Sequence, residues 1–148
     1  MELCVFCEVS SAELLRNLRK VAAMSQPTVA ILGASADPTK FGNKAVKAHL
    51  KMGYTVFPIN PKGGTIEGLA ALTSLADVPI DRLDRISVYL PPSVTASVLP
   101  EIAAFDADEV WFNPGSANDD VVAQARAMGI DPIIACSIVD LGVNPNDA

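Results

Sequence analysis

The sequence predicts an α/β domain in which helices cover both faces of a mostly parallel β-sheet. Short apolar runs rich in β-branched residues alternate along the chain with segments of helical periodicity, as in consecutive βαβ units. The loops that end these runs are rich in Gly, Pro, Ser and Asn. At 148 residues, of which 50% are hydrophobic, the chain is long enough for one core and therefore for one domain.

The sequence of the first half of the domain predicts one βαβ unit, followed by a segment that could be either strand or helix. In order, the elements are a strand at 28–32, a helix at 43–52, a strand at 54–59 and the ambiguous segment at 65–84. The run Val29–Leu32 is apolar and stops at Gly33, which is typical of a strand buried on both faces. Gly53 ends the helix. The ambiguous segment fits either a short strand or a helical turn near Leu69–Leu75.

The second half continues the alternation. It predicts a strand at 85–90, a helix at 93–104, a strand at 109–112, a helix ending at Met128 and a last strand at 131–135. Ser93 is a candidate N-cap for the first helix, because its hydroxyl can accept a bond from a free backbone N–H. Asn118 or Asp119 can cap the second helix in the same way. Right-handed crossovers leave few topologies for this order of elements.

The two ends of the chain flank this domain. Ser10–Glu13 has the spacing of a capping box, and leucines follow it at helical intervals, so we expect a short N-terminal helix. We assign residues 1–24 to an N-terminal extension with this helix, 25–141 to the ligand-binding domain and 142–148 to a C-terminal tail. Cys4 and Cys7 have the spacing of half a zinc site or of a redox dithiol. No second Cys or His pair completes a zinc set, and no βαβ unit encloses the motif as in a redox dithiol, so a plain apolar extension is favoured.

Composition excludes several classes of partner. Eleven Lys and Arg against 17 Asp and Glu give a formal charge of -6, which disfavours a nucleic-acid-binding surface. No apolar run is long enough to span a membrane, and Glu2 and Glu8 stand where a signal peptide has basic residues. Three cysteines in a chain without such a signal do not indicate a disulfide framework. We therefore expect a soluble, cytoplasmic protein.

The loop after the first strand, Gly33–Gly42, favours phosphate. It precedes a helix, whose unpaired N–H groups and dipole attract anions, although it lacks the spacing of a dinucleotide fingerprint or a P-loop. The loop after the second strand has Asn60, Pro61 and Lys62 where NAD-binding domains usually place an acid on the ribose. A lysine there suits an adenosine whose ribose is phosphorylated.

Lysines are concentrated in this region. Between Pro38 and Ile66 the chain has five lysines and no acidic residue. Three of them, Lys44, Lys47 and Lys51, share one helix face and are expected to be solvated. Lys40 and Lys62 belong instead to strand-end loops, where each ammonium could meet a separate phosphate.

Catalytic candidates are few. The only histidine, His49, lies in the middle of a predicted helix, which favours a half-buried packing role over catalysis. Cys136 is the one nucleophile at a predicted strand end, and an inert cysteine is the simpler interpretation. Trp111 is either a core residue or has an indole edge at the cleft. No catalytic triad or metal-ligand spacing can be assembled at the strand ends.

Five segments together resemble the small stand-alone CoA-binding-domain proteins, which are similar to the N-terminal domain of the succinyl-CoA synthetase α subunit. The segments are VAILGAS with the loop to Phe41-Gly42, GYTVFPINPKG, the strand ending at Pro91, VWFNPG and the closing Cys136. The likeness covers about Thr28 to Asp140. It implies a Rossmann-like, doubly wound sheet with CoA laid across the strand ends.

The resemblance also implies roles for single residues. Gly33, Ala34, Ser35 and Lys40 would line the pyrophosphate site, and Phe41 and Gly42 close that loop. Asn60, Pro61 and Lys62 would take the adenosine with its 3'-phosphate. Pro91, Asn113, Pro114 and Gly115 would border the pantetheine arm, and Cys136 would lie near its thiol end.

From this resemblance we expect the protein to be a module that binds CoA or an acyl-CoA without catalysis of its own. The synthetase uses a second domain with a phosphorylated histidine, which has no counterpart in this sequence. Two alternatives stay open: an NADP-binding oxidoreductase-like or sensing domain, and a subunit that completes an acyl-CoA ligase site with a partner. A homo-oligomer is also compatible with the sequence.

Overall fold

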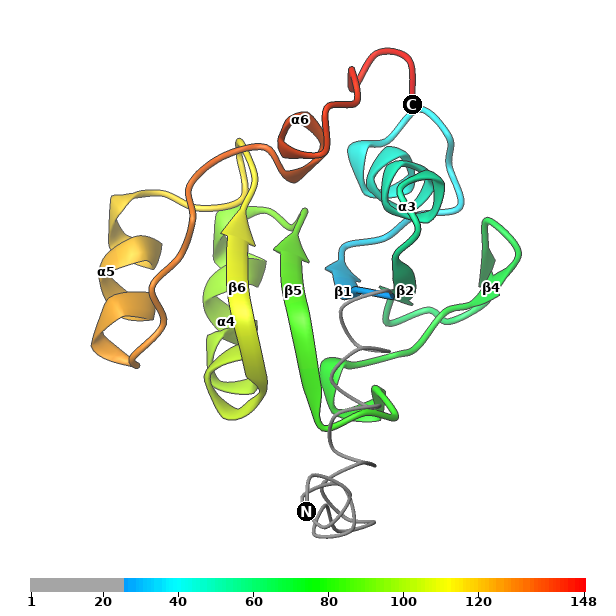
Figure 1. Cartoon of the computed structure of the whole chain (residues 1–148). Helices are drawn as coiled ribbons and strands as arrows, with labels where there is room; N and C mark the ends of the chain where they lie inside the picture. The colour runs from blue at the N-terminus through cyan, green and yellow to red at the C-terminus, as the bar shows by residue number, and fades with distance from the viewer. Residues whose placement is uncertain (1–25) are drawn as a thin grey trace, which may run out of the picture.

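The structure is a computed structural model that describes residues 26–148 (Figure 1). Its elements are β1 (Thr28–Leu32), α3 (Phe41–Lys51), β2 (Thr55–Ile59), β3 (Thr65–Ile66), β4 (Leu69–Ala70), a 3-10 turn (Leu75–Asp77), β5 (Arg82–Val88), α4 (Pro92–Ala104), β6 (Asp106–Phe112), α5 (Asp119–Ala127) and α6 (Ser137–Asp140). The predicted α/β class is confirmed. The predicted N-terminal helix, Cys4 and Cys7 lie outside the described residues.

The central sheet has the order β2-β1-β5-β6, and all its strands are parallel. Alternate residues of each strand point to opposite faces, so β1 contributes Val29 and Ile31 to one core and Ala30 and Leu32 to the other. One core is covered by α3 and α6 and the other by α4 and α5. The fold is therefore a doubly wound, Rossmann-like sheet with helices on both faces.

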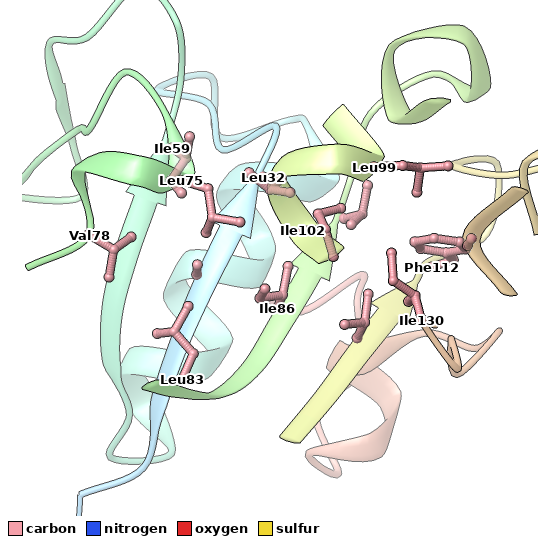
Figure 2. Packing of buried hydrophobic residues seen from close by; sticks show 14 of the residues in the cluster. Leu32, Ile59, Leu75, Val78, Leu83, Ile86, Leu99, Ile102, Phe112 and Ile130 are labelled. Atoms are coloured by element: carbon pink, nitrogen blue, oxygen red, sulfur yellow. The ribbon is translucent and has the colours of Figure 1, made fainter. Parts of the chain in front are cut away.

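The larger core lies under α4 and α5. Figure 2 shows Leu83 and Ile86 of β5 and Phe112 of β6 on the sheet side, with Leu99 and Ile102 of α4 packed over them. These five side chains are at most 2% exposed. Burying a side chain of this size contributes about 1.5–3 kcal/mol, so this core anchors the two strands whose ends form one side of the site.

Two sequence-based expectations differ from the structure, and one that was left open is resolved. The segment 131–135 makes only a single parallel bridge, Trp111 to Ile133, because Pro132 has no N–H and the chain turns away at Cys136. Pro91, not Ser93, is the N-cap residue of α4, and Pro92 takes the first helical position.

The ambiguous segment 65–84 resolves into the β3–β4 hairpin and the 3-10 turn. By contrast, Asn118 caps α5 as expected, since its side chain accepts a bond from the Val121 N–H.

The C-terminal residues are not detached from the domain. Leu141 and Val143 pack against the core under α3 and α6. Among the helices that the structure describes, none is long and apolar enough to cross a membrane.

Candidate ligand-binding site at the strand ends

A cavity of about 690 Å³ opens at the carboxyl ends of the parallel strands. Strand order reverses here, because β2 and β5 lie on opposite sides of β1, and open α/β sheets bind ligands at such points. The cavity is lined by Gly33, Ala34, Ser35, Lys40, Phe41, Gly42, Asn60, Pro61, Tyr89, Leu90, Pro91, Pro92, Pro114, Gly115, Ser116 and Cys136. It thus joins the loops that follow β1, β2, β5 and β6.

Two glycines, at the two ends of the loop between β1 and α3, let this loop pack closely against neighbouring backbone. Gly33 has a φ of +83°, and a Cβ on it would lie 2.3 Å from the Tyr89 carbonyl oxygen. A Cβ on Gly42 would lie 2.1 Å from the Gly33 carbonyl oxygen. Only hydrogen fits at either position, so the end of β1, the start of α3 and the end of β5 meet at the floor of the cavity.

The loop between β1 and α3 is held by its own short side chains. Asp37 accepts bonds from the Thr39 N–H at 2.9 Å and the Thr39 hydroxyl at 2.7 Å, and these bonds hold the pKa of Asp37 below its ordinary value. Ser35 Oγ accepts the Asp37 N–H at 3.1 Å. Lys40 is the N-cap residue of the 11-residue α3, which has no acidic residue in its first turn. The loop therefore offers an anion a helix N-terminus and an exposed ammonium group.

Asn60 connects the loops after β1 and β2. Its Nδ2 donates to the Ala34 carbonyl at 3.0 Å, and its Oδ1 accepts the Lys62 N–H at 2.9 Å. Both ends of the amide are used inside the protein, so Asn60 contributes shape to the cavity and fixes the turn that presents Lys62. Asn43 makes a similar link, since its Nδ2 donates to the Ser35 carbonyl at 2.8 Å and to Glu67 at 3.0 Å.

A buried polar network lies behind the other end of the cavity. Asn113, at the end of β6, donates to Ser87 Oγ and accepts the Ser137 N–H, both at 2.8 Å. Ser137 in turn contacts the Tyr89 hydroxyl at 3.0 Å. The network positions α6 and the neighbouring Cys136, which is partly buried and lines the cavity.

Twelve of the fourteen residues expected at the site line the cavity. The other two, Lys62 and Asn113, lie outside the lining: Lys62 is exposed on the turn after Asn60, and Asn113 is 2% exposed and belongs to the buried network. Four lining residues are absent from the sequence-based set, namely Tyr89, Leu90, Pro92 and Ser116. Each is next to an expected residue or one removed from it, so extending each predicted loop by two residues would have included them.

Two other side chains singled out from the sequence, His49 and Trp111, lie away from the cavity lining. His49 is fully buried in α3, where its Nδ1 lies 2.7 Å from the Ala45 carbonyl, so its packing role is deeper than the half-buried one expected. Trp111 is 5% exposed, and the Arg85 guanidinium carbon lies 4.6 Å from its ring centroid. Within residues 26–148 no group of three or more His, Cys, Asp or Glu is placed to hold a metal ion.

Comparisons with known proteins bear on the same region. The chain is 33% identical over 86 residues to the α subunit of an ADP-forming acetate–CoA ligase I of Pyrococcus furiosus, a match that covers 54% of this chain and 18% of that subunit. The chain therefore spans less than a fifth of the length of this curated relative.

Two of the solved structures that resemble this chain are matched over most of their length. A conserved hypothetical protein from Pyrococcus furiosus is 32% identical, with a TM-score of 0.68 over 77% of this chain and 98% of that one. The structure of cell-free ID.343 from Thermus thermophilus is 30% identical, with a TM-score of 0.69 over 84% and 94%.

The family model described as a CoA binding domain matches residues 27–142, which include all four strands of the sheet and every residue that lines the cavity. On this match, over more than half of the sequence, the chain belongs to the family of CoA-binding-domain proteins.

Proposed function

We propose that this chain binds CoA or an acyl-CoA in the strand-end cavity, as a binding module without catalysis of its own. The observation that carries the proposal is that one continuous cavity, of a volume usual for ligand sites, joins the loops after all four strands. A ligand with phosphates at one end and a long, narrow arm fits such a space. Family membership supports CoA as that ligand.

The phosphates would lie at the loop between β1 and α3. Gly33, Ala34 and Ser35 supply backbone close to the cavity, and Lys40 supplies a positive charge beside the start of α3. A helix N-terminus of this kind stabilises an anion by about 0.3–1 kcal/mol at an exposed site. The CoA pyrophosphate is the group that this loop would hold.

The adenosine and its 3'-phosphate would lie at the loop after β2. Pro61 lines the cavity, and Lys62 follows it on the exposed outer side of the turn. No acidic side chain follows β2 in the sequence before Glu67, so the turn that would face a ribose phosphate has no carboxylate of its own. Pro91, Pro114, Gly115 and Cys136 would then border the pantetheine arm.

The ligand preference tests this proposal directly. We expect calorimetric titration of the full chain to give a dissociation constant for CoA of about 1 μM, about -8 kcal/mol, with clearly weaker binding of NAD. NADP in parallel tests the alternative of an oxidoreductase-like domain, since it also has a phosphorylated ribose. Tighter binding of NADP than of CoA, or no heat with CoA at millimolar concentration, would contradict the proposal.

Lys62 gives a second prediction. If its ammonium pairs with the 3'-phosphate, Lys62→Ala should weaken CoA by about tenfold, the low end of the range for a bond to a charged group, because Lys62 is exposed. Dephospho-CoA lacks this phosphate and should bind both proteins about equally.

The matched control is Lys51→Ala, because Lys51 is an exposed lysine at the far end of α3. We expect it to change CoA affinity by less than twofold. Equal weakening of CoA and dephospho-CoA by Lys62→Ala would show that Lys62 does not bind the 3'-phosphate.

A further inference from the structure

Glu67 occupies a strained position at the tip of the β3–β4 hairpin. The paired residues Ile66 and Leu69 enclose a two-residue turn, Glu67-Gly68. Both turn residues have positive φ, +50° for Glu67 and +78° for Gly68, and Glu67 is the only residue other than glycine with positive φ among residues 26–148. Turns of this kind favour Asn, Asp or Gly, because longer L side chains are strained there. The turn itself therefore does not account for a glutamate.

The Glu67 carboxylate instead holds a buried amide. Its Oε1 accepts a hydrogen bond from Asn43 Nδ2 at 3.0 Å, and the same nitrogen donates to the Ser35 carbonyl at 2.8 Å. Asn43 is fully buried in the first turn of α3, and its Oδ1 has no hydrogen-bond partner among residues 26–148. A rotated amide would place Oδ1 against two acceptors. Within the described residues, Glu67 and Ser35 alone therefore fix the Asn43 side chain by hydrogen bonds.

The other contacts of Glu67 do not require a glutamate. The hairpin is anchored by Ile66, which is 2% exposed in the core under α3. The Lys47 ammonium lies 4.0 Å from Glu67 Oε1, but the two side chains are 37% and 31% exposed, so solvent and salt screen their attraction. An asparagine at position 67 would relieve the strain, yet its side chain is one methylene group shorter and would not reach Asn43. The bond to Asn43 is the contact that depends on the length of the glutamate.

Asn43 connects this contact to the loop between β1 and α3. Its Nδ2 binds the carbonyl of Ser35, a residue of the cavity lining in the segment proposed to hold the pyrophosphate. Because the peptide group is planar, a bond to its carbonyl fixes the whole group. The place of the Ser35 peptide in the cavity wall therefore depends on the Asn43 amide, and the amide depends on Glu67.

We infer that Glu67 is a positioning residue for ligand binding: through Asn43 it holds the Ser35 segment in the geometry that binds the pyrophosphate of the ligand. The inference rests on the proposed function. It assigns a favourable role to a carboxylate near an anion site, although the negative charge itself opposes an anion. Loss of the charge and loss of the positioning contact therefore change the affinity in opposite directions, which makes the two effects separable.

The first test replaces Glu67 in two ways and measures binding of CoA and dephospho-CoA by calorimetry. Glu67→Gln removes the charge and keeps an acceptor of the same reach, whereas Glu67→Asn removes the charge and shortens the side chain. We expect Glu67→Asn to weaken both ligands about three- to tenfold, as for loss of one hydrogen bond. Glu67→Gln, the conservative variant, should bind both at least as tightly as wild type. Loss of the charge alone would instead strengthen binding in both variants.

Asn43→Ala tests the second step of the connection, because it removes both bonds of the amide. We expect it to weaken CoA and dephospho-CoA by at least the factor seen for Glu67→Asn. The double variant should bind no more weakly than Asn43→Ala alone, since the two residues act in series. If its melting temperature shows that Asn43→Ala is not folded at the temperature of the titrations, the comparison of the two Glu67 variants decides.

Three results would overturn the inference while the proposed function stands: Glu67→Asn that binds both ligands as tightly as wild type, equal weakening by Glu67→Gln and Glu67→Asn, or additive losses in the double variant. Weakening of CoA but not of dephospho-CoA would show that the change acts on the turn at Lys62 and the 3'-phosphate, which also refutes the inference. Failure of the wild-type protein to bind CoA would instead refute the proposed function itself.

Discussion

Replacing Gly33 by alanine is expected to lower the free energy of unfolding by about 2–5 kcal/mol. The new methyl group would lie 2.3 Å from the Tyr89 carbonyl oxygen and 2.8 Å from its carbon, and a φ of +83° disfavours any L side chain. Tyr89 cannot move aside freely, because its N–H donates to the Leu32 carbonyl at 2.8 Å. Backbone strain contributes about 1–2 kcal/mol and overpacking about 1–3 kcal/mol.

Gly53→Ala is the matched control for this effect. Gly53 has nearly the same φ, +85°, but a Cβ there has nothing within 4 Å. Gly53→Ala should therefore lower the free energy of unfolding only by the contribution of backbone strain, about 1–2 kcal/mol. Urea unfolding of both variants measures the difference, which isolates the close approach of β1 to β5. Equal losses would show that the loop relaxes around the methyl group.

The same glycine shows why much of the fold could be predicted from the sequence. A run of apolar residues that stops at Gly33, followed by a helical segment and a second apolar run, is a local pattern, and local patterns set the elements of a βαβ unit. Parallel pairing then places all strand ends at one edge, so Pro91, Pro114 and Cys136 meet although they are far apart in sequence.

The features that could not be predicted from the sequence depend on contacts between residues that lie far apart along the chain. Asn113 has the residue type of a ligand-binding amide, but both its polar atoms are used by Ser87, Val88 and Ser137, and only the folded structure brings these together. Tyr89 has an apolar ring at the end of an apolar strand, which does not distinguish a core residue from a cavity wall. The segment 131–135 has strand-like composition, yet a proline and a turn reduce it to one bridge.

The polar and charged side chains under α3 and α6 affect how the stability of the protein depends on pH. Arg85 is 5% exposed, and its Nη2 lies 2.8 Å from Asp140 and 3.7 Å from Glu109. His49 and Arg85 both lie against Tyr54, since the His49 and Tyr54 ring centroids are 4.9 Å apart and the guanidinium carbon is 5.6 Å from the Tyr54 ring. A second positive charge in this region would be costly, so His49 is held neutral.

Acidification is therefore expected to destabilise the protein before its carboxylates titrate. Burial lowers the pKa of His49 from 6.5 to about 4, with the bond to Ala45 opposing this and the charge of Arg85 adding to it. Between these values the unfolded chain binds a proton that the folded protein excludes, so stability falls as pH falls below 6.5. Each pKa unit corresponds to about 1.4 kcal/mol, which predicts a loss of about 2 kcal/mol at pH 5 and about 3 kcal/mol at pH 4.

His49→Gln tests this, because glutamine is close to histidine in size and does not titrate. The variant should be less stable than wild type at pH 7, owing to the altered packing, but should lose about 2 kcal/mol less between pH 7 and pH 5. Urea unfolding at half-unit steps of pH gives the two slopes. The range above pH 5 separates His49 from ordinary carboxyl groups, which titrate lower and affect both proteins alike. Parallel stability curves over that range would show that His49 is protonated in the folded protein and that its burial does not exclude the charge.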